Sequence, residues 1–442
     1  YYKMSLSNTV RTHLLDPRTI NDQRCEFRIP DGFYASSMKL IDLGVHDSQL
    51  TGAEGVFYPT ITGVMSIVKN IFLYSDTTLI DSLQNVAQYV SVQALKTSNQ
   101  GSVDLNNQLL LNGMGFRGQS AEPQETPAGA NNNPALSRPG SLVLGGKDMY
   151  SFNKIGNKFA VNNQVPIPKD DRQQSGSVLV SQYLQFLKTV SMLPMIPDLR
   201  LVLEWDTNAA SYYKDPDTAA AITLGLKVMR PTLVIDEILN VDPAEGESYA
   251  LPYLATIVER FVVPEATSAL VPTRSSYKSQ AFTSKFVKDI MFFNLPSADL
   301  ATAADRWLTR ETRSVAQDNE KLQLVVNNKN HLPDQGITSL AQKYHYFNEA
   351  QTQLNLPLAA GAYNIQDTSG NIVGASAAPL VGQYSVTAVK VGQTVNDLRI
   401  EYERTRGSTP SSGSDGSGFT LLAFGTVAKT LTKQGDRVRV SY

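Results

Sequence analysis

The side chains that could carry acid–base or metal chemistry are few and widely spaced. The four histidines are His13, His46, His331 and His345. No two of them have the HxH or HExxH spacing that brings two imidazoles to one zinc ion. His345 stands between two tyrosines in a candidate helix, which favours a packing or surface role over catalysis. The histidines therefore predict neither a metal site nor a general base.

The single cysteine, Cys25, lies between Arg24 and Glu26 in a stretch with strand character. One cysteine excludes a disulfide within the chain and a CxxC metal or redox site. No histidine is near Cys25 in the sequence, so we interpret it as a small buried apolar residue rather than a nucleophile. The absence of a disulfide framework fits assembly inside a cell.

Paired carboxylates need a check because glycosidases use two of them. Three acidic pairs are close enough in sequence: Glu204 and Asp206, Asp236 and Glu237, and Glu401 and Glu403. Glu401 and Glu403 would share a strand face with Arg399, and Arg404 follows them, which is typical of a solvated and charge-balanced face. We interpret all three pairs as surface groups and predict no catalytic residue.

Motifs for phosphate, nucleotide or calcium binding are missing from the sequence. Gly145-Gly146-Lys147 lacks the earlier glycine of a GxxxxGK[ST] loop, no GxGxxG fingerprint opens a helix, and GxSxG does not occur. Ser412–Gly416 lacks the density of aspartate and asparagine that a calcium loop needs, and its composition predicts a flexible loop. We therefore expect no cofactor and no metal.

The composition describes a globular chain with little net charge. The 442 residues (48.3 kDa) are 42% apolar and only 18% charged, and 39 basic against 41 acidic residues give a net charge of −2. This length allows two or three domains with a sizeable core. The charge balance argues against a protein that binds nucleic acid through phosphates. The longest apolar runs, such as Ala219–Leu226 and Leu356–Ala362, are far below the ~20 residues of a membrane helix, and the N-terminus lacks a hydrophobic signal core.

Strand patterns dominate the elements that must hold these residues. Apolar and polar residues alternate in Leu199–Trp205, Leu398–Tyr402 and Arg437–Val440, which predicts strands with one face on a core. More continuously apolar runs, which favour strands buried on both faces without excluding a buried helix, are Ile71–Tyr74, Ile290–Phe293 and Leu421–Phe424. Helical spacing predicts helices in Ser177–Val190, Ile337–Gln351 and Leu300–Val315, the last with Trp307 as a packing residue. Two polar stretches predict long loops, Gly115–Gly140 and Ser408–Gly418.

Two pairs of similar segments recur in the same order along the chain. Val68–Tyr74 aligns with Val287–Phe293, and Asp198–Leu201 aligns with Asp397–Ile400. A helix candidate precedes the Asp-Leu-Arg strand in both halves. We infer two tandem, related β domains, each of two packed antiparallel sheets, joined within Asn208–Thr218. The alternative is a pair of unrelated strands with similar composition.

The ordered series of segments resembles the double jelly-roll major capsid proteins of the adenovirus-like lineage of double-stranded DNA viruses. Within that lineage it looks most like the proteins of Polinton-like viruses and virophages. The series that carries the resemblance is Phe27–Pro30, Ile67–Asp76, a helix leading into Leu193-Pro194 and Asp198–Trp205, then Val395–Tyr402 and Phe419–Tyr442. The resemblance implies an all-β chain with an N-terminal arm (residues 1–24), a first jelly roll (25–210) and a second jelly roll (211–442), with a few short helices in loops.

The resemblance also implies a structural role without enzymatic activity. Three chains would form a homotrimeric, pseudo-hexameric capsomer, and such capsomers would cover an icosahedral capsid in the virion. The partners would be neighbouring capsomers, minor capsid and penton proteins, and an inner membrane or minor proteins contacted by the arm. No sequence-specific nucleic-acid binding is expected. The alternatives are a minor capsid, fibre or receptor- or glycan-binding β-sandwich protein and, less favoured, a β-sandwich carbohydrate-active enzyme.

Overall fold

The computed structural model describes residues 9–46, 63–90, 174–206, 213–215, 220–221, 227–228, 230–268, 270–296, 320–351, 386–405 and 418–442. The candidate helix Leu300–Val315 with Trp307, and the loop Gly115–Gly140, lie outside the described residues. So does the loop Ser408–Gly418, apart from Gly418. The structure therefore bears on the strands, on two of the candidate helices and on most candidate site residues.

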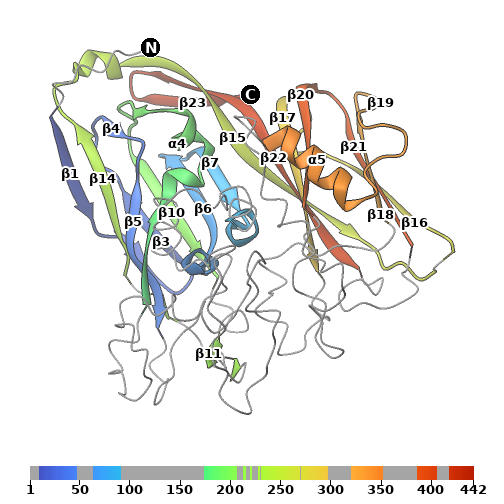
Figure 1. Ribbon diagram of the computed structural model, residues 1–442. Coiled ribbons are helices and arrows are strands. Elements are labelled where there is room, and N and C mark those ends of the chain that lie inside the picture. The colour runs from blue at the N-terminus through green and yellow to red at the C-terminus, as the bar shows by residue number, and fades with distance from the viewer. Residues whose placement is uncertain are drawn as a thin grey trace.

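The first half of the chain forms two antiparallel sheets that pack face to face (Figure 1). One sheet contains β13 (Lys227–Val228), β5 (Lys39–His46), β14 (Thr232–Ile238), β4 (Tyr34–Ala35) and β9 (Met192–Leu193), with β1 (Val10–Leu15) on β14 and β8 (Gln174–Leu179) on β5. The other contains β2 (Thr19–Ile20), β3 (Arg24–Arg28), β10 (Leu199–Trp205), β6 (Val68–Ser75) and β7 (Thr78–Gln84). Inward residues such as Leu201 of β10 and Ile235 of β14 are fully buried, as alternation in half-buried strands requires.

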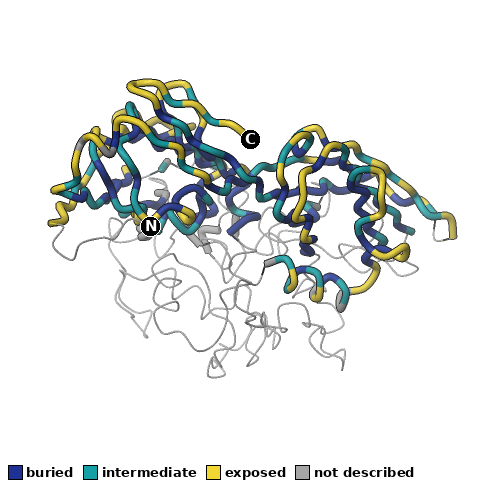
Figure 2. The backbone as a smooth tube through the Cα atoms, turned by 90° about the horizontal axis from the view of Figure 1, so that it is seen from above, coloured by how far each residue is buried: buried dark blue, intermediate teal, exposed yellow. Residues whose placement is uncertain are grey.

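The second half repeats this architecture. One sheet has the order β15 (Ser248–Val263), β22 (Phe419–Gln434), β17 (Lys285–Pro296) and β20 (Thr387–Val395), with β23 (Arg437–Ser441) on β22. The other has the order β16 (Thr273–Lys278), β21 (Leu398–Arg404), β18 (Glu320–Val326) and β19 (Lys329–Asn330). A short hairpin, β11 (Tyr213–Asp215) and β12 (Ala220–Ala221), lies between β10 and β13 of the first half in sequence. Buried residues run through both lobes of the molecule (Figure 2).

The sheet orders show which strands of the two halves correspond. The series β3-β10-β6-β7 in the first half matches β16-β21-β18-β19 in the second, and β8-β5-β14 matches β20-β17-β22. Backbone hydrogen bonds repeat as well: Ile29 N donates to Leu199 O and Ser279 N to Leu398 O, both at 2.9 Å. The match of Asp198–Leu201 with Asp397–Ile400 is therefore confirmed by equivalent strands, β10 and β21.

The second aligned pair of segments in the inferred duplication is wrong. Val68–Tyr74 lies on β6, whose counterpart is β18, whereas Val287–Phe293 lies on β17, the counterpart of β5. Both segments are apolar strands buried in a core, and that shared composition produced the alignment. The two halves are related by sheet order and not by this segment.

Strand pairing also bears on where the halves meet. β13 and β14 pair with β5 and β1 of the first half, so the sheets divide after Ile238, further along the chain than residue 210. Within the expected N-terminal arm (residues 1–24), β1 pairs with β14 along six residues and β2 pairs with β3. This part of the arm is a component of the first barrel.

Of the candidate helices, Ile337–Gln351 is confirmed as α5 (Leu340–Gln351). Ser339 Oγ accepts from Gln342 N at 3.2 Å, and Gln342 Oε1 accepts from Ser339 N at 3.1 Å, a reciprocal capping box. The prediction for Ser177–Val190 is largely wrong: its first residues belong to β8, and α4 covers only Gln185–Thr189. The β-branched Val178 pairs with Leu40 of β5, and this long-range pairing outweighs the local helical spacing. Short 3₁₀ turns occupy Gly63–Ile67 (η1), Val180–Gln182 (η4) and Pro243–Gly246 (η6).

The 16-residue strands β15 and β22 are longer than one barrel requires. They pair along their whole length, and their far ends with β23 extend over the first half (Figure 1). Val427, Leu431 and Lys433 lie on one face of β22, and all three are buried. Val427 lies in the part of the strand that belongs to the second half, and the other two lie further along the strand. Residues Thr430 and Thr432 point the other way and are half-buried. One ribbon thus belongs to the core of one barrel and covers the other.

Candidate functional site

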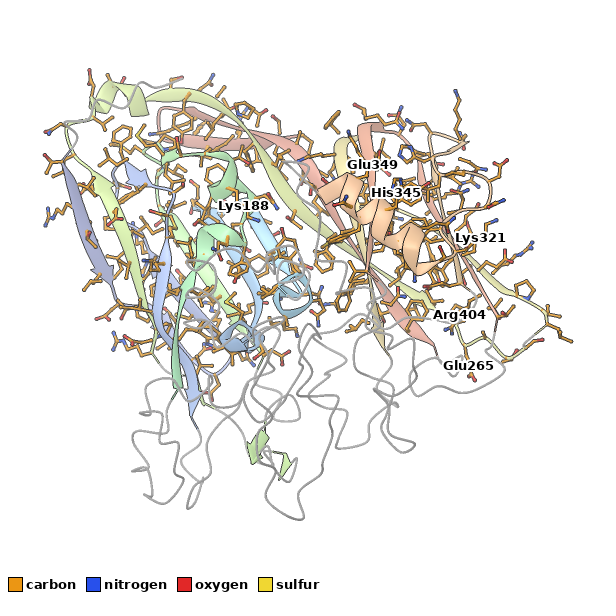
Figure 3. All side chains as sticks on the ribbon, in the orientation of Figure 1. Lys188, Glu265, Lys321, His345, Glu349 and Arg404 are labelled. Atoms are coloured by element: carbon orange, nitrogen blue, oxygen red, sulfur yellow. The ribbon has the colours of Figure 1, made fainter. Side chains whose placement is uncertain are left out.

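The structure buries Cys25 and separates the histidines. Cys25 is free and fully buried, and burial raises the pKa of its thiol to about 12, which confirms a packing role. His13 Nε2 lies 2.7 Å from Glu237 Oε2, with its ring edge-on to Tyr34. His331 Nε2 lies 2.6 Å from the carbonyl oxygen of Lys390. His345 is on α5 in the second half, with its ring 5.3 Å from that of Tyr346 (Figure 3). The side chain of His46 lies outside the described residues.

The three carboxylate pairs lie on three different sheets and form no common site. Glu204 of β10 accepts a hydrogen bond from Asn70 Nδ2 at 2.6 Å. Asp236 of β14 accepts one from Thr12 Oγ1 at 2.7 Å, and its neighbour Glu237 contacts His13. Each of these carboxylates serves a strand-to-strand contact. Among the described residues, no three histidine, cysteine, aspartate or glutamate side chains are placed to hold a metal ion.

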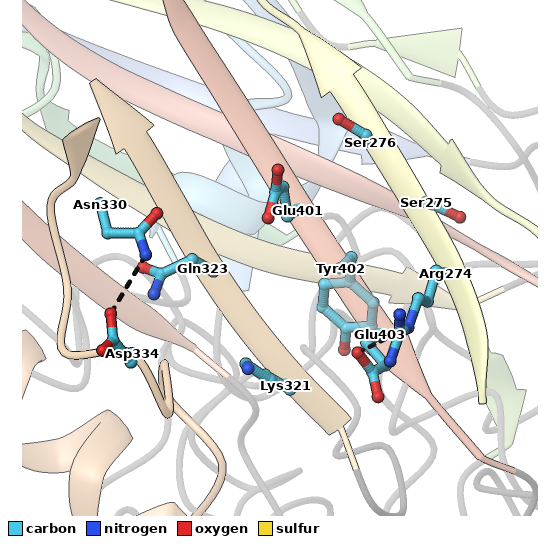
Figure 4. A pocket seen from close by; sticks show the side chains of 10 residues that line it. All are labelled: Arg274, Ser275, Ser276, Lys321, Gln323, Asn330, Asp334, Glu401, Tyr402 and Glu403. Atoms are coloured by element: carbon cyan, nitrogen blue, oxygen red, sulfur yellow. Dashed lines mark hydrogen bonds and ion pairs between the residues drawn. The ribbon is translucent and has the colours of Figure 1, made fainter. Parts of the chain in front are cut away.

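The third pair lines a polar groove on the outer face of the second half (Figure 4). The groove has a volume of about 430 Å³ and crosses β16, β21 and β18. Its lining residues are Arg274, Ser275, Ser276, Lys321, Gln323, Asn330, Asp334, Glu401, Tyr402 and Glu403. Arg274 Nε lies 3.1 Å from Glu403, and Asn330 Nδ2 donates to Asp334 at 3.2 Å. Glu401 and Glu403 lie on a polar face as predicted, whereas Arg404, expected beside them, is buried, and the residues that line the groove include no histidine to activate its serines.

A buried charged cluster in the second half escaped the sequence analysis. Glu320 of β18 forms an ion pair with Lys343 of α5 and accepts a hydrogen bond from the hydroxyl of Tyr402. Arg404 is 1% exposed, donates to Pro264 O at 2.8 Å and stacks over the Phe419 ring. Burial lowers the pKa of Lys343 to about 7. The cluster joins the helix to the sheet, so we interpret it as structural.

The junction between the halves is a second buried polar region that the sequence did not reveal. Asp81 of β7 is fully buried and accepts hydrogen bonds at 2.9 Å from the backbone N–H groups of Ser82 and Phe186. Burial raises its pKa to about 6, against the lowering effect of those bonds and of Lys429. The hydroxyl of Tyr253 on β15 donates to Ile80 O at 2.6 Å.

Further contacts across the junction are aromatic and cationic. The rings of Phe186 and Tyr253 meet edge to face at 4.8 Å. Lys433 Nζ donates to Met195 O at 2.9 Å and to Gly246 O at 2.6 Å. Lys188, marked on α4 in Figure 3, is exposed, and its Nζ lies 5.9 Å from the centre of the Tyr89 ring. These contacts join the two barrels side by side.

No helix among the described residues is long and apolar enough to cross a membrane.

Comparisons by sequence find no match: no family model matches this chain, and no curated protein does. Comparisons by structure find several. A chain of the Sputnik virophage matches with a TM-score of 0.54 at 13% identity, over 98% of this chain and 88% of that one. The Faustovirus major capsid protein matches with a TM-score of 0.55 at 10% identity, over 97% and 91%. A chain of the PBCV-1 virus capsid matches with a TM-score of 0.50 at 10% identity, over 100% and 98%.

At these identities the likeness establishes the fold. The chain has two tandem β barrels arranged as in viral major capsid proteins, and this class of fold extends over nearly its whole length. The particular architecture is the double jelly roll that the sequence predicts.

Proposed function

We propose that this chain is the structural major capsid protein of an icosahedral double-stranded DNA virus, of the virophage or Polinton-like kind. The observation that carries the proposal is the two-barrel fold, shared over 97% of this chain with the Faustovirus major capsid protein. The buried junction supports it, because a rigid pair of barrels is a suitable building block for a shell. The proposed role is structural and not enzymatic.

Three such chains would make one capsomer. Two barrels per chain give six barrels per trimer, so a ring with threefold symmetry has a nearly hexagonal outline and packs in a hexagonal layer. Related but unequal barrels let the trimer approximate sixfold symmetry while each half keeps its own contacts. The near-zero net charge suits dense packing, since it limits repulsion between subunits.

The proposal extends to partners and location. The chain would lie in the virion shell, after assembly inside the host cell, with neighbouring capsomers, minor capsid proteins and pentons around it. The residues ahead of β1 would contact minor proteins or an inner membrane. Deleting residues 1–8 should then weaken the shells, and deleted chains that still give shells of normal size and stability would contradict this contact.

Electron microscopy of the purified chain tests the capsid role. The expected images show trimers with a hexagonal outline that associate into flat arrays or closed shells at high concentration. The proposal fails if the particles are single chains that bind glycans on an array. It also fails if they hydrolyse a glycan and lose that activity in Glu204→Gln.

A further inference from the structure

Apart from Tyr442, which is 61% exposed, the most exposed large apolar side chains of the described residues lie in two segments. In the connection between β15 and β16 and at the adjoining end of β15, Val262, Leu270 and Val271 are 72%, 91% and 67% exposed. On the outward face of β1, Leu14 is 67% and Val10 is 55% exposed. We name these the β15–β16 patch and the β1 patch. Grouped apolar exposure of this kind marks an interaction surface, whereas isolated exposed apolar residues need no explanation.

The two patches lie at opposite ends of the molecule. β1 is an edge strand of the first half, paired with β14, and the β15–β16 connection projects from the far end of the second half (Figures 1 and 2). One chain cannot bring these ends together. A contact between them must therefore join two copies head to tail, and such a contact forms a closed ring when the rotation between successive copies closes.

Both patches are presented by ordered backbone. Ser268 Oγ accepts hydrogen bonds from the N–H groups of Leu270 at 3.2 Å and Val271 at 3.0 Å, which fixes the turn that exposes them. The hydroxyl of Tyr277 donates to Val262 O and ties the end of β15 to β16. At the other end, β1 pairs with β14 along all six residues.

The uncompensated charge beside the β1 patch is positive. Leu14, Val234 and Lys39 stand in one row across β1, β14 and β5, and Lys39 is exposed without an ion-pair partner among the described residues. The carboxylates nearby are already engaged: Asp236 accepts from Thr12, and Asp16 lies 3.5 Å from Arg230.

The uncompensated charge beside the β15–β16 patch is negative. Glu265, in this connection, is exposed and has no ion-pair partner within the part of the chain that the structure describes (Figure 3). The neighbouring cations are engaged: Arg274 pairs with Glu403, and Arg404 donates to Pro264 O. Each patch thus combines exposed apolar side chains with a free charge of the opposite sign to the other.

We propose that the β15–β16 patch of one chain docks on the β1 patch of a second copy, with Glu265 facing Lys39, and that three such contacts close the ring. This inference rests on the proposed capsomer and names the surfaces that hold it together. It assigns an interface role to the end of each half that lies away from the junction.

Sedimentation velocity on the full chain and two double variants tests the contact. Leu270→Asp with Val271→Asp removes one patch, and Val10→Asp with Leu14→Asp removes the other. Each double variant should lose the trimer and sediment as one 48.3 kDa chain, with unchanged far-ultraviolet circular dichroism. Phe286→Asp is the control, since Phe286 is 43% exposed but lies outside both patches, and it should remain trimeric.

Mixing the two double variants tests the head-to-tail geometry. Each retains the patch that the other lacks, so one contact forms per pair and the mixture should contain one-to-one dimers without trimers. If each patch instead bound the same patch of another copy, each double variant would form dimers by itself. Mixing the two variants would then produce no new species. That result would overturn the proposal.

Charge reversal tests the pairing with substitutions on exposed residues that keep the fold. Glu265→Lys alone and Lys39→Glu alone should each reduce the trimer fraction, and a chain with both should regain it. If the unaltered chain is a trimer and all these variants remain fully trimeric, the surfaces are wrong while the capsomer stands. If the unaltered chain is itself a monomer, the proposed function fails first.

Discussion

The two barrels share one sheet order but differ in what stabilises them. In the first half, β10 and β14 bury apolar residues, and the polar contacts between strands are partly exposed, as between Asn70 and Glu204. In the second half, a helix docks through buried charges, Glu320 with Lys343. Duplication of a fold therefore preserves the backbone pattern while the cores diverge.

The halves also differ in how far each depends on the other for its core. The second half contributes both 16-residue strands, β15 and β22, to its own sheet and extends them over the first. The first half has no strand that covers the second in the same way among the described elements. We infer that the first barrel depends on the second for part of its core, and the asymmetry gives each barrel a distinct outer end.

The largest expected effect comes from a substitution in the buried charged cluster of the second half. Glu320→Gln leaves the Lys343 ammonium without its carboxylate in a buried site, which should cost about 3–5 kcal/mol of unfolding free energy. The matched change in the first half, Glu204→Gln, alters a partly exposed contact and should cost about 1 kcal/mol. Urea unfolding of both variants makes the comparison. Equal losses would contradict the difference between the two cores.

The next effect concerns pH at the junction. The pKa of Asp81 is about 6 in the fold and ~3.9 in an unfolded chain, so the protonated form is favoured by folding. Its contribution is fully present below about pH 4 and is lost as the pH rises through about 6, a change of about 3 kcal/mol. Urea unfolding at pH 4.5 and 7.5 should show about 2 kcal/mol of this loss, since the unfolded chain is already largely ionised at pH 4.5. Asp81→Asn should remove that part of the pH dependence, and an unchanged profile in the variant would contradict the assignment.

A smaller effect should distinguish the first barrel, which β15 and β22 cover, from the second barrel, to which these strands belong. Lys433→Met removes the donor to Met195 O and Gly246 O, and two buried carbonyls without partners should cost about 1–3 kcal/mol. Hydrogen exchange should rise around β9 and η6 more than in β18 and β21. Lys321→Met, on the partly exposed groove of the second half, is the control and should change little.

The smallest effect lies on the outer face of the second half. Arg274→Ala removes an ion pair in which the Arg274 side chain is 75% exposed, so the loss should be at most about 1 kcal/mol and should shrink in salt. Thermal unfolding at low and high ionic strength measures it. A loss comparable to that of Glu320→Gln would show that the groove is part of the core.

The strands that place one face on a core could be predicted from the sequence. Burial alternates strictly along Leu398–Arg404, and it alternates along Leu199–Trp205 except at Val202, which is also buried. The helix predicted at Ser177–Val190 failed because the pairing of Val178 with Leu40 is invisible to local spacing. Continuous apolar runs likewise could not tell β6 from β17.

The buried polar groups were beyond prediction for a different reason. Asp81 meets the Phe186 backbone across 105 residues, and Lys433 meets Met195 across 238. Lys343 and Glu320 lie in segments whose burial depends on the whole barrel. The lack of catalytic spacing among the histidines could be read from the sequence, whereas the contact of His13 with Glu237 across 224 residues could not.

The native mass of the purified chain, measured by light scattering after size exclusion, tests the central claim most directly. The account predicts a stable species of three times 48.3 kDa, since six barrels are needed for a pseudo-hexameric capsomer. A single chain mass that persists over a wide range of concentration would contradict it.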